Sequence, residues 1–416
     1  MDPRFREGDV RQSTHRHARE SGHPSCAAPR LGRLCNSPAH SANLVDKPTA
    51  LLYNRERVFC GFLNSPRRDV YSTKSEKSSF IEQRSRKGTM RYDEIVNKGL
   101  RILRDAGIEH WLNLGAETQS QNRINREYMD SLTFEMRLLG DGKWAGTRTS
   151  LFGVDLPAPI MPAALTASRV INKLALWEDP WLEIFAAGVA KAGSIMWVGM
   201  STTYELHRIM DQGAPVVKIV KPLVENVEIV HRIKDAERYG AVAVGIDIDA
   251  MYLEKAFDEK PGPPFFGPKS LAEIKSFRQE TSLPFVIKGI LSVHDALIAR
   301  DEIKADCLVV SNHGGEAIDY SMPILKALPE IRAAVPDMTI LVDSGFKRGT
   351  DVLKALALGA DGVCVGNLLL LAFVANGADG VADMLGILTS ELQRNMSITG
   401  PKSIAAIEPS ILRTLG

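Results

Sequence analysis

Short apolar runs alternate with longer segments of helical periodicity from residue 157 onward. Such runs predict strands that are buried on both faces, as in a parallel sheet covered by helices. Eight units of this kind within about 210 residues fit a closed barrel better than an open sheet. The runs span residues 158–164, 194–199, 215–220, 241–248, 284–289, 307–312, 339–344 and 362–367. We therefore predict an α/β fold, a (β/α)8 TIM barrel over residues 157–416 with an N-terminal helical extension.

The chain before the barrel divides near residue 90. Residues 1–89 carry 17 Lys+Arg against 9 Asp+Glu and show no sustained helical or strand period. Residues 90–416 carry 34 and 41, and a helical pattern begins directly after Met90. We predict that residues 1–89 form a disordered or dispensable tail. We expect residues 90–156 to form helices and a short hairpin that cap the barrel.

Composition narrows the class of protein. The 416 residues include 51 Lys+Arg, 50 Asp+Glu and 44% hydrophobic residues, which is typical of a globular protein and argues against a nucleic-acid partner bound by bulk charge. Five cysteines do not make a disulfide framework, so we expect a reducing compartment and a cytoplasmic protein. The apolar stretch 368–375 is too short to span a membrane. The Cys and His residues of the tail lack zinc-ligand spacing, so we predict no metal site.

Polar side chains stand in or at the ends of several predicted strands, where a barrel places its chemistry. Lys218 lies in the third strand, Asp247 ends the fourth, Lys288 lies in the fifth and Asp343 ends the seventh. Strand alternation predicts that both lysines face the mouth or interior of the barrel. A buried ammonium needs an anionic or strongly accepting partner. The lysines therefore predict either a bound ligand or structural pairs with Asp247 or Asp343.

The loops after the seventh and eighth strands combine glycines with basic residues. The end of the seventh strand and its loop have the sequence DSGFKRGTD, which begins at Asp343. The eighth strand and its loop have the sequence GVCVGN, which ends at Asn367. These loops place Lys347 and Arg348 where many barrels hold a phosphate through backbone N–H groups and a helix N-terminus. A plain glycine turn is the alternative, and the basic residues favour the phosphate site.

His313 is the strongest candidate for a catalytic group. It follows Ser311 and Asn312 at the end of the sixth strand and precedes Gly314, so it stands on a tight turn at the mouth. An imidazole that titrates near neutral pH is the usual general base. Asp247 could orient this base and stabilise its charged form. The alternatives are a structural histidine and a pairing of Asp247 with a lysine.

These residues form a pattern that resembles a known family. The motifs are PFVIKG at 284–289, SNHGG at 311–315, then Ile318, Asp319 and Tyr320, and VDSGFKRGTDVLKALALGADGVCVGN at 342–367. Over about residues 92–408 the chain is similar to the FMN-dependent α-hydroxy-acid dehydrogenases and oxidases, which include glycolate oxidase, lactate oxidase and mandelate dehydrogenase. The tail before Met90 lies outside the resemblance.

The resemblance implies FMN held over the barrel mouth. Lys288 would face the N1 and O2 side of the flavin, and His313 would take a proton from the substrate as a hydride equivalent reaches flavin N5. Asp247 would steady that histidine. The resemblance also implies a homo-oligomer, commonly a tetramer. The implied cofactor-binding residues are Pro162, Ala163, Ala164, Gly199, Lys218, Lys288, Ser311, His313, Gly314, Asp343, Gly345, Lys347, Gly366 and Asn367.

The substrate side departs from the family pattern. Glu316 stands where the family has the Arg that clamps the substrate carboxylate, and Glu254 lies near a second family Arg. Two family tyrosines that hydrogen-bond the substrate correspond to Trp111 and Val220. Carboxylates in place of a bidentate arginine pair would repel a carboxylate substrate. We therefore expect Trp111, Glu254 and Glu316 to line a site for a small hydroxyl or amine substrate, 2-hydroxy-acid-like or related, that is neutral or cationic near Glu316.

Two other classes of function stay open at this point. One is a flavin-binding barrel without redox turnover, and the presence of His313 argues against it. The other is a flavin-free phosphate-sugar aldolase or isomerase, in which Lys288 would form a Schiff base. A flavin absorption spectrum of the purified protein separates them, because the aldolase would be colourless.

Overall fold

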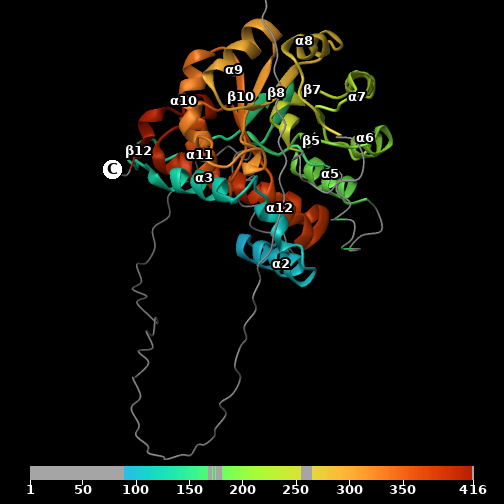
Figure 1. Ribbon diagram of the computed structural model, residues 1–416. Helices are drawn as coiled ribbons and strands as arrows, with labels where there is room; N and C mark the ends of the chain where they lie inside the picture. Colours follow the sequence, from blue (N-terminus) through green and yellow to red (C-terminus); the bar gives the residue numbers. More distant parts are fainter. Residues whose placement is uncertain (1–88, 167–170, 172–173, 175–179, 254–264, 415–416) are drawn as a thin grey trace, which may run out of the picture. The chain divides into compact units, whose positions relative to one another are not determined.

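Eight parallel strands form the central sheet of the protein (Figure 1). The computed structural model describes residues 89–166, 171, 174, 180–253 and 265–414. The strands are β4 (Ile160–Pro162), β5 (Met196–Val198), β6 (Val216–Val220), β7 (Ala243–Asp247), β8 (Phe285–Ile290), β9 (Cys307–Val310), β10 (Thr339–Val342) and β11 (Gly362–Val365). Their order in the sheet is β4-β11-β10-β9-β8-β7-β6-β5. Each predicted run therefore corresponds to one strand.

The sheet closes into a barrel between β4 and β5. Leu165 forms a parallel bridge with Val198. The Leu165 amide donates to the carbonyl of Trp197 at 3.2 Å, and its own carbonyl accepts from the amide of Gly199 at 2.6 Å. Closure leaves the sheet without an open edge. The predicted (β/α)8 fold is confirmed.

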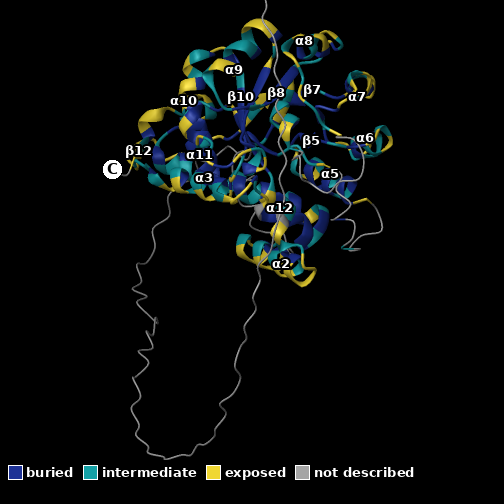
Figure 2. Ribbon diagram, in the orientation of Figure 1, coloured by how far each residue is buried: buried dark blue, intermediate teal, exposed yellow. Residues whose placement is uncertain are grey.

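Both faces of the strands are buried, which explains their apolar sequences (Figure 2). The inward-facing residues of the strands pack in one cluster: Met161, Trp197, Val217, Ile219, Ala243, Val286, Cys307, Val309, Leu341 and Cys364. The alternate residues, such as Val216, Val220 and Val310, pack with the helices in a second cluster. This alternation decides which residues reach the mouth at the carboxyl ends of the strands.

Helices surround the barrel (Figure 1). They are α5 (Trp181–Ala192), α6 (Thr203–Met210), α7 (Asn226–Arg238), α8 (Leu271–Gln279), α9 (Val293–Ile298), α10 (Ile324–Ala334), α11 (Gly349–Ala357) and α12 (Asn367–Thr399), with short helical turns η2 (Ile248–Tyr252), η3 (Ala299–Ile303), η4 (His313–Gly315), η5 (Ile404–Ala406) and η6 (Pro409–Ile411). The N-termini of α6 and α8 are stabilised by local side chains. Thr202 with Glu205, and Ser270 with Glu273, form capping boxes at α6 and α8.

Helices and a hairpin precede the barrel. The elements are α2 (Tyr92–Asp105), η1 (Glu109–Asn113), α3 (Ser120–Ser131), β1 (Leu132–Phe134), β2 (Thr149–Leu151) and β3 (Val154–Leu156), and β1 pairs antiparallel with β12 (Leu412–Thr414). In the β2–β3 hairpin, Phe152 lies against Trp197 with ring centroids 6.3 Å apart. Leu156 belongs to the core inside the barrel, so this hairpin packs against its amino-terminal end.

The last long helix, α12, is unusually apolar. By length and composition alone, the span Asn367–Ala406 is apolar enough to cross a membrane, but 67% of its most apolar 18 residues are buried inside the protein. α12 packs against α2, α5 and α11. This packing accounts for its apolar residues. The stretch 368–375 considered from the sequence is therefore only the start of a much longer helix, whose backbone is interrupted at Asn376 and Gly377.

Candidate active site

The mouth of the barrel is built from one inward-facing position at the carboxyl end of each strand, which we call the mouth layer. Each position lies two or four residues beyond a residue of the core inside the barrel, so alternation turns it inward. The mouth layer consists of Ala163, Gly199, Lys221, Asp247, Lys288, Ser311, Asp343 and Gly366. Seven of these residues were predicted from the sequence, and Lys221 was missed.

The mouth layer has a small half and a polar half. Ala163, Gly199 and Gly366 come from β4, β5 and β11, which adjoin one another in the closed sheet. A Cβ added to Gly366 would lie 3.7 Å from the Cβ of Ala163, so these two positions are in contact distance. The polar members come from β6 to β10, with Lys288 on the strand opposite β4. The small half therefore carries no large side chain at the three strand ends opposite the Lys288 side of the mouth.

Asp247 joins two buried lysines in the polar half. It stands opposite Lys288 in the register of β7 and β8, and Lys288 Nζ donates to its Oδ1 at 3.1 Å. Lys221 Nζ donates to its Oδ2 at 2.6 Å. Lys288 also lies 3.7 Å from a carboxylate oxygen of Asp343 and 3.4 Å from Ser311 Oγ. The predicted structural pairing of a lysine with Asp247 is therefore present.

His313 contacts this network through both of its ring nitrogens. Nδ1 lies 2.6 Å from Asp249 Oδ1 and 3.3 Å from Lys288 Nζ. Nε2 lies 3.4 Å from Lys221 Nζ. Because the nearest partner of Nδ1 is a carboxylate oxygen, we assign the proton of the neutral ring to Nδ1 and the lone pair to Nε2. This tautomer leaves Nε2 as the atom that can accept a proton.

The partner that orients His313 differs from the prediction. Asp247 Oδ1 is 3.7 Å from His313 Nδ1, whereas Asp249 Oδ1 is 2.6 Å away. Asp247 is held instead by the two lysines, which leave it no short contact with the ring. The expectation that Asp247 steadies the imidazole directly was therefore wrong, and Asp249 takes that position.

Burial and neighbouring charges shift the pKa values of the two aspartates and of Lys288. Burial acts to raise the pKa of Asp247, but the Lys221 and Lys288 ammonium groups outweigh it and hold this pKa well below its usual range. Burial and the charge of Asp247 raise the pKa of Asp249. Burial would lower the pKa of Lys288, but the carboxylates of Asp247, Asp249 and Asp343 raise it above its usual range. Lys288 is therefore an ammonium ion at neutral pH.

The turn that carries His313 has an uncommon backbone conformation. His313, Gly314 and Gly315 all have positive φ, at 52°, 63° and 91°. A Cβ at Gly315 would lie 2.6 Å from a side-chain atom of Gln121 in α3. The Gly314 amide donates to Ser344 Oγ at 3.1 Å, which ties this turn to the loop after β10. The glycines are therefore needed to place the imidazole over the mouth.

Lys218 does not lie in the mouth. It alternates with Val217 and Ile219, which face the inside of the barrel, so its side chain faces the helices. Its Nζ donates to Gly199 O at 2.5 Å and to Ser201 Oγ at 2.7 Å. Burial lowers the pKa of Lys218 to about 7. The prediction that Lys218 faces the mouth was wrong, as was the substrate-side position of Val220, which packs with the helices.

The first turn of α11 is already occupied by carboxylates of the chain. The Asp351 carboxylate accepts from the amides of Lys347 and Arg348, and Glu391 accepts from the amide of Gly349. The Arg348 guanidinium pairs with Glu391. Arg348 therefore stabilises α11 and is not free for a phosphate. Lys347 is exposed, and within the described part of the chain its ammonium group has no hydrogen bond or ion pair.

The remaining predicted residues lie in varied surroundings. Pro162 is buried at the end of β4, and Ala164 is half-buried beside the mouth. Gly345 is exposed with a φ of 93°, and Asn367 begins α12 and donates to Leu112 O at 2.7 Å. Glu316 is exposed and has no side-chain contact with the described part of the cluster. Trp111 lies in η1 at a position whose side chain is not described, and Glu254 lies outside the described residues.

Asp247, Asp249 and His313 also have the chemical types of metal ligands. Their ligand atoms lie within 4.8 Å of one another. However, Lys221 and Lys288 already place two ammonium groups against the carboxylates, at 2.6 and 3.1 Å from Asp247. These ammonium groups would repel a cation at the same position. We therefore interpret the cluster as an ion-pair network.

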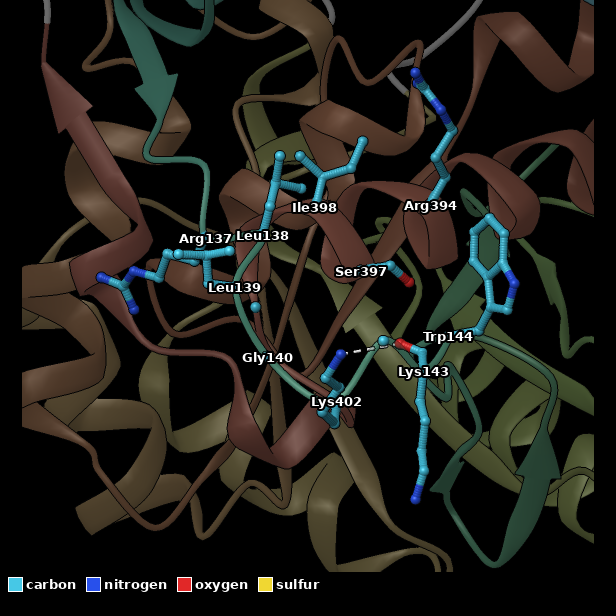
Figure 3. A pocket seen from close by; sticks show the side chains of 12 residues that line it. Arg137, Leu138, Leu139, Gly140, Lys143, Trp144, Arg394, Ser397, Ile398 and Lys402 are labelled. Carbon is cyan, nitrogen blue, oxygen red and sulfur yellow. Dashed lines mark hydrogen bonds between the residues drawn. The ribbon is translucent and has the colours of Figure 1, made fainter.

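A separate cavity lies away from the mouth, between residues 137–144 and the end of α12 (Figure 3). It has a volume of about 380 Å³ and includes Lys143, Arg394 and Lys402. The Lys402 ammonium donates to Lys143 O at 2.9 Å. The side chains of Lys143 and Arg394 extend in different directions, so their charges do not converge on one ligand position (Figure 3). This cavity takes no part in the site described above.

Comparison with known proteins decides the family. The model of the family described as "FMN-dependent dehydrogenase" matches residues 104–263 and 265–414. The chain belongs to this family. FMN-dependent dehydrogenases are flavoproteins, and the match covers the barrel and most of the segment before it. The predicted FMN cofactor and the oxidoreductase class are confirmed by this match and by the similar proteins below.

Several hydroxy-acid oxidases are similar to this FMN-dependent dehydrogenase. Glycolate oxidase 3 of Arabidopsis thaliana is 28% identical, and the alignment covers 78% of this chain and 95% of the relative. A peroxisomal (S)-2-hydroxyacid oxidase of the same plant is 30% identical, with 73% and 90% covered. A mandelate oxidase structure has a TM-score of 0.68 at 29% identity and covers 78% of this chain and 98% of its own. Another was solved with a monooxide FMN adduct and has a TM-score of 0.67 at 30% identity, with 76% and 98% covered.

Family membership argues against the flavin-free aldolase or isomerase considered from the sequence. A flavin-free aldolase needs a neutral lysine to form a Schiff base. The carboxylates around Lys288 raise its pKa and keep it charged, against the effect of burial. Both this charge and the FMN-dependent family argue against the aldolase. The protein is a 2-hydroxy-acid-oxidase-like, FMN-dependent oxidoreductase.

Proposed function

We propose that this enzyme oxidises a hydroxyl-bearing, 2-hydroxy-acid-like small molecule, with His313 Nε2 as the base. The observation that carries the proposal is the single cluster formed by His313, Asp249 and Lys288 at the barrel mouth. A base that is oriented by a carboxylate and stands beside a fixed cation has the parts that an alcohol oxidation needs. The named activities of the similar oxidases agree in class.

The residues of the mouth fit FMN. Lys288 offers a buried positive charge that would stabilise negative charge on the ring, and the small half of the mouth layer has no large side chain that would block the ring. Gly345, Gly366 and the exposed Lys347 stand at the loops proposed to hold the ribityl chain and phosphate. FMN supplies the two-electron acceptor for this oxidation.

Side chains of the protein accept the hydroxyl proton of the substrate and stabilise its charge. The Asp249 carboxylate holds Nδ1–H, so Nε2 keeps its lone pair and can accept the hydroxyl proton of a substrate. Once Nε2 is protonated, the negative charge of Asp249 stabilises the imidazolium. Asp247 acts indirectly, because it fixes the positions of Lys221 and Lys288 around the imidazole ring of His313.

Substrate polarity follows from Glu316. This carboxylate is exposed three residues after His313, at the position where the sequence pattern predicted loss of the arginine clamp. We infer a substrate that is neutral or cationic at the end that approaches Glu316, because a second carboxylate there would be repelled. An amide such as 2-hydroxy-phenylacetamide has the required hydroxyl without the charge.

The function is tested by anaerobic mixing of the FMN-loaded full chain with glycolate, L-lactate, (S)-mandelate and 2-hydroxy-phenylacetamide. The expected result is loss of the absorbance of oxidised FMN with at least one compound, and a faster loss with the amide than with (S)-mandelate. If bound FMN stays oxidised with this panel and with a wider set of alcohols and amines, the protein is a flavin-binding barrel without turnover.

We extend the proposal to cellular context. Cys307 and Cys364 are buried free thiols, and we propose that the protein resides in a reducing, cytoplasmic compartment. A homo-oligomer, as a tetramer, is proposed from the family resemblance. The tail, residues 1–89, lies before the family match and is proposed to be dispensable. Cell fractionation, light scattering and a chain that begins at Met90 test these three points.

A further inference from the structure

The mouth layer contains one buried ammonium group that the mechanism above does not use. Lys221 follows the last residue of β6 and is 8% exposed. Its Nζ lies 2.6 Å from Asp247 Oδ2 and 3.4 Å from His313 Nε2. Within the described residues it therefore has one carboxylate partner, and that carboxylate also binds Lys288 at 3.1 Å.

The two lysines of the network differ in how their charge is matched. Lys288 has three carboxylates within 3.7 Å, those of Asp247, Asp249 and Asp343. Among the described residues, Lys221 is paired with one carboxylate, that of Asp247, which it shares with Lys288. An ammonium group has three donors, and the contacts of Lys221 with Asp247 and His313 leave one donor without a described partner. Lys221 thus keeps both charge and a hydrogen-bond donor for a further oxygen atom.

We propose that Lys221 is a catalytic residue that binds the reacting oxygen of the substrate beside His313 Nε2. The inference rests on the proposed function. An oxygen about 2.8 Å from both nitrogens, a normal hydrogen-bond distance, completes a triangle whose third side is the 3.4 Å separation of Nζ and Nε2. When substrate binds, its hydroxyl donates to the Nε2 lone pair in place of Lys221, and the Lys221 ammonium donates to the hydroxyl oxygen instead of to Nε2.

Oxidation at this position removes two hydrogens from the substrate. The O–H and C–H bonds of the substrate break and a C=O bond forms. The hydroxyl proton goes to Nε2 of His313, and bound FMN would supply the acceptor for the carbon-bound hydrogen and its electron pair. As the O–H bond breaks, negative charge grows on the oxygen, and the buried ammonium of Lys221 stabilises that charge in a site with little water.

This position defines what the site recognises. The group bound between Lys221 and His313 is the alcohol oxygen that reacts, and not a carboxylate of the substrate. Recognition through the reacting oxygen is compatible with Glu316, because it needs no second cation for an acid group. The class of substrate is therefore a secondary or primary alcohol next to an amide or another group that is neutral or cationic.

The experiment compares the FMN-loaded full chain with Lys221→Met, Lys221→Arg and, as a control, Lys326→Met. Lys326 is an exposed lysine of α10. Two quantities are measured for each protein: the rate of anaerobic FMN reduction by the best compound of the panel, with (S)-mandelate included, and the dissociation constant of phenylacetamide. Phenylacetamide has the ring and amide group of 2-hydroxy-phenylacetamide but no hydroxyl.

We expect Lys221→Met to slow FMN reduction by roughly 100-fold or more, the size of effect seen when one donor to a developing oxyanion is removed. Binding of phenylacetamide should change less than about threefold, because it is uncharged and has no reacting oxygen. Lys221→Arg should keep part of the rate, and Lys326→Met all of it. A Lys221→Met enzyme that works at the wild-type rate, or one that loses phenylacetamide binding as strongly as rate, overturns the inference.

A spectroscopic reading separates this inference from the proposed function. In protein with 15N-labelled histidine, the Nε2 resonance of His313 reports the hydrogen bond from Lys221. We expect it to move in Lys221→Met and to stay in Lys326→Met. If no compound reduces wild-type FMN, the proposed function fails. An unchanged Nε2 resonance in Lys221→Met overturns the role of Lys221 independently.

Discussion

Asp247 and Lys288 stand directly opposite each other on β7 and β8, and their charged groups meet at 3.1 Å inside the barrel mouth. Lys288 is 4% exposed and is the cation on which three carboxylates converge. A charge buried this deeply is stable only while its partners are in place. Several properties of the protein should therefore depend on this pair.

Lys288→Met should lower the free energy of unfolding by about 3–5 kcal/mol at pH 7, because it leaves buried carboxylates without their cation. The carboxylates raise the folded-state pKa of Lys288 above its ordinary value of 10.5, against the effect of burial. Its stabilising effect is therefore complete below pH 10.5 and is lost only as the pH rises through the folded-state pKa. Urea unfolding of wild type and Lys288→Met at pH 6 and pH 9 measures this difference, which should be similar at the two pH values. Equal stability of the two proteins would contradict the prediction.

Lys218→Met should give a pH dependence of the opposite kind. Burial lowers the folded-state pKa of Lys218 from 10.5 to about 7, so the unfolded chain binds more protons between these values. Wild-type stability should therefore rise relative to Lys218→Met from pH 7 to pH 10, by an amount on the order of a few kcal/mol. Denaturation curves at several pH values provide the test. A difference that does not vary with pH would show that Lys218 is charged throughout.

Asp249→Asn should slow FMN reduction by roughly 100-fold to 10,000-fold while the protein still binds FMN. An amide at this position can donate to Nδ1, which favours the tautomer with the proton on Nε2 and removes the base. Stopped-flow absorbance measures the rate, and FMN content is measured in parallel. Exposed Asp337, changed to Asn, is the control. Full activity of Asp249→Asn would return the orienting role to Asp247.

Lys347→Met should weaken FMN binding by roughly 10-fold to 100-fold, the range of a charged hydrogen bond to phosphate. Its stability without FMN should stay within about 0.5 kcal/mol of wild type, because this exposed ammonium has no partner in the described part of the chain. Fluorescence titration of the apoprotein with FMN gives the affinity. Unchanged FMN affinity would remove Lys347 from the phosphate site.

Glu316→Arg should shift the choice of substrate. Reversal of the charge beside the mouth should raise the rate with (S)-mandelate relative to 2-hydroxy-phenylacetamide by about 10-fold or more. The ratio of the two rates is the quantity to compare, since it cancels changes in FMN content. A ratio equal to that of wild type would show that Glu316 does not face the substrate.

The sequence was sufficient for the barrel and for most of the mouth. Eight apolar runs located the eight strands, and the strand ends at Asp247, Lys288 and Asp343 do meet in the mouth. The sequence did not predict side-chain direction in strands whose two faces are equally apolar. In VVKIV, both faces of β6 are apolar, so the sequence does not reveal that Lys218 faces the helices. Counting two positions beyond the inward Ile219 would have found Lys221.

Asp249 illustrates a different limit. It lies in η2, a turn after β7, where no strand or helix period applies to side-chain direction. Only the path of the turn brings it to 2.6 Å from His313. The sequence did contain one signal, the carboxylate pair Asp247 and Asp249 two positions apart at a strand end. That spacing made Asp249 an equal candidate to orient the histidine.

The most direct test of the account is a single-turnover comparison of wild type, His313→Gln and the exposed control His231→Gln, each loaded with FMN and mixed anaerobically with the best substrate. We expect wild type and His231→Gln to reduce FMN at the same rate. His313→Gln should bind FMN and substrate but reduce FMN at least about 1,000-fold more slowly, because glutamine cannot accept the hydroxyl proton. Reduction by His313→Gln at the wild-type rate would contradict the assignment of Nε2 as the base.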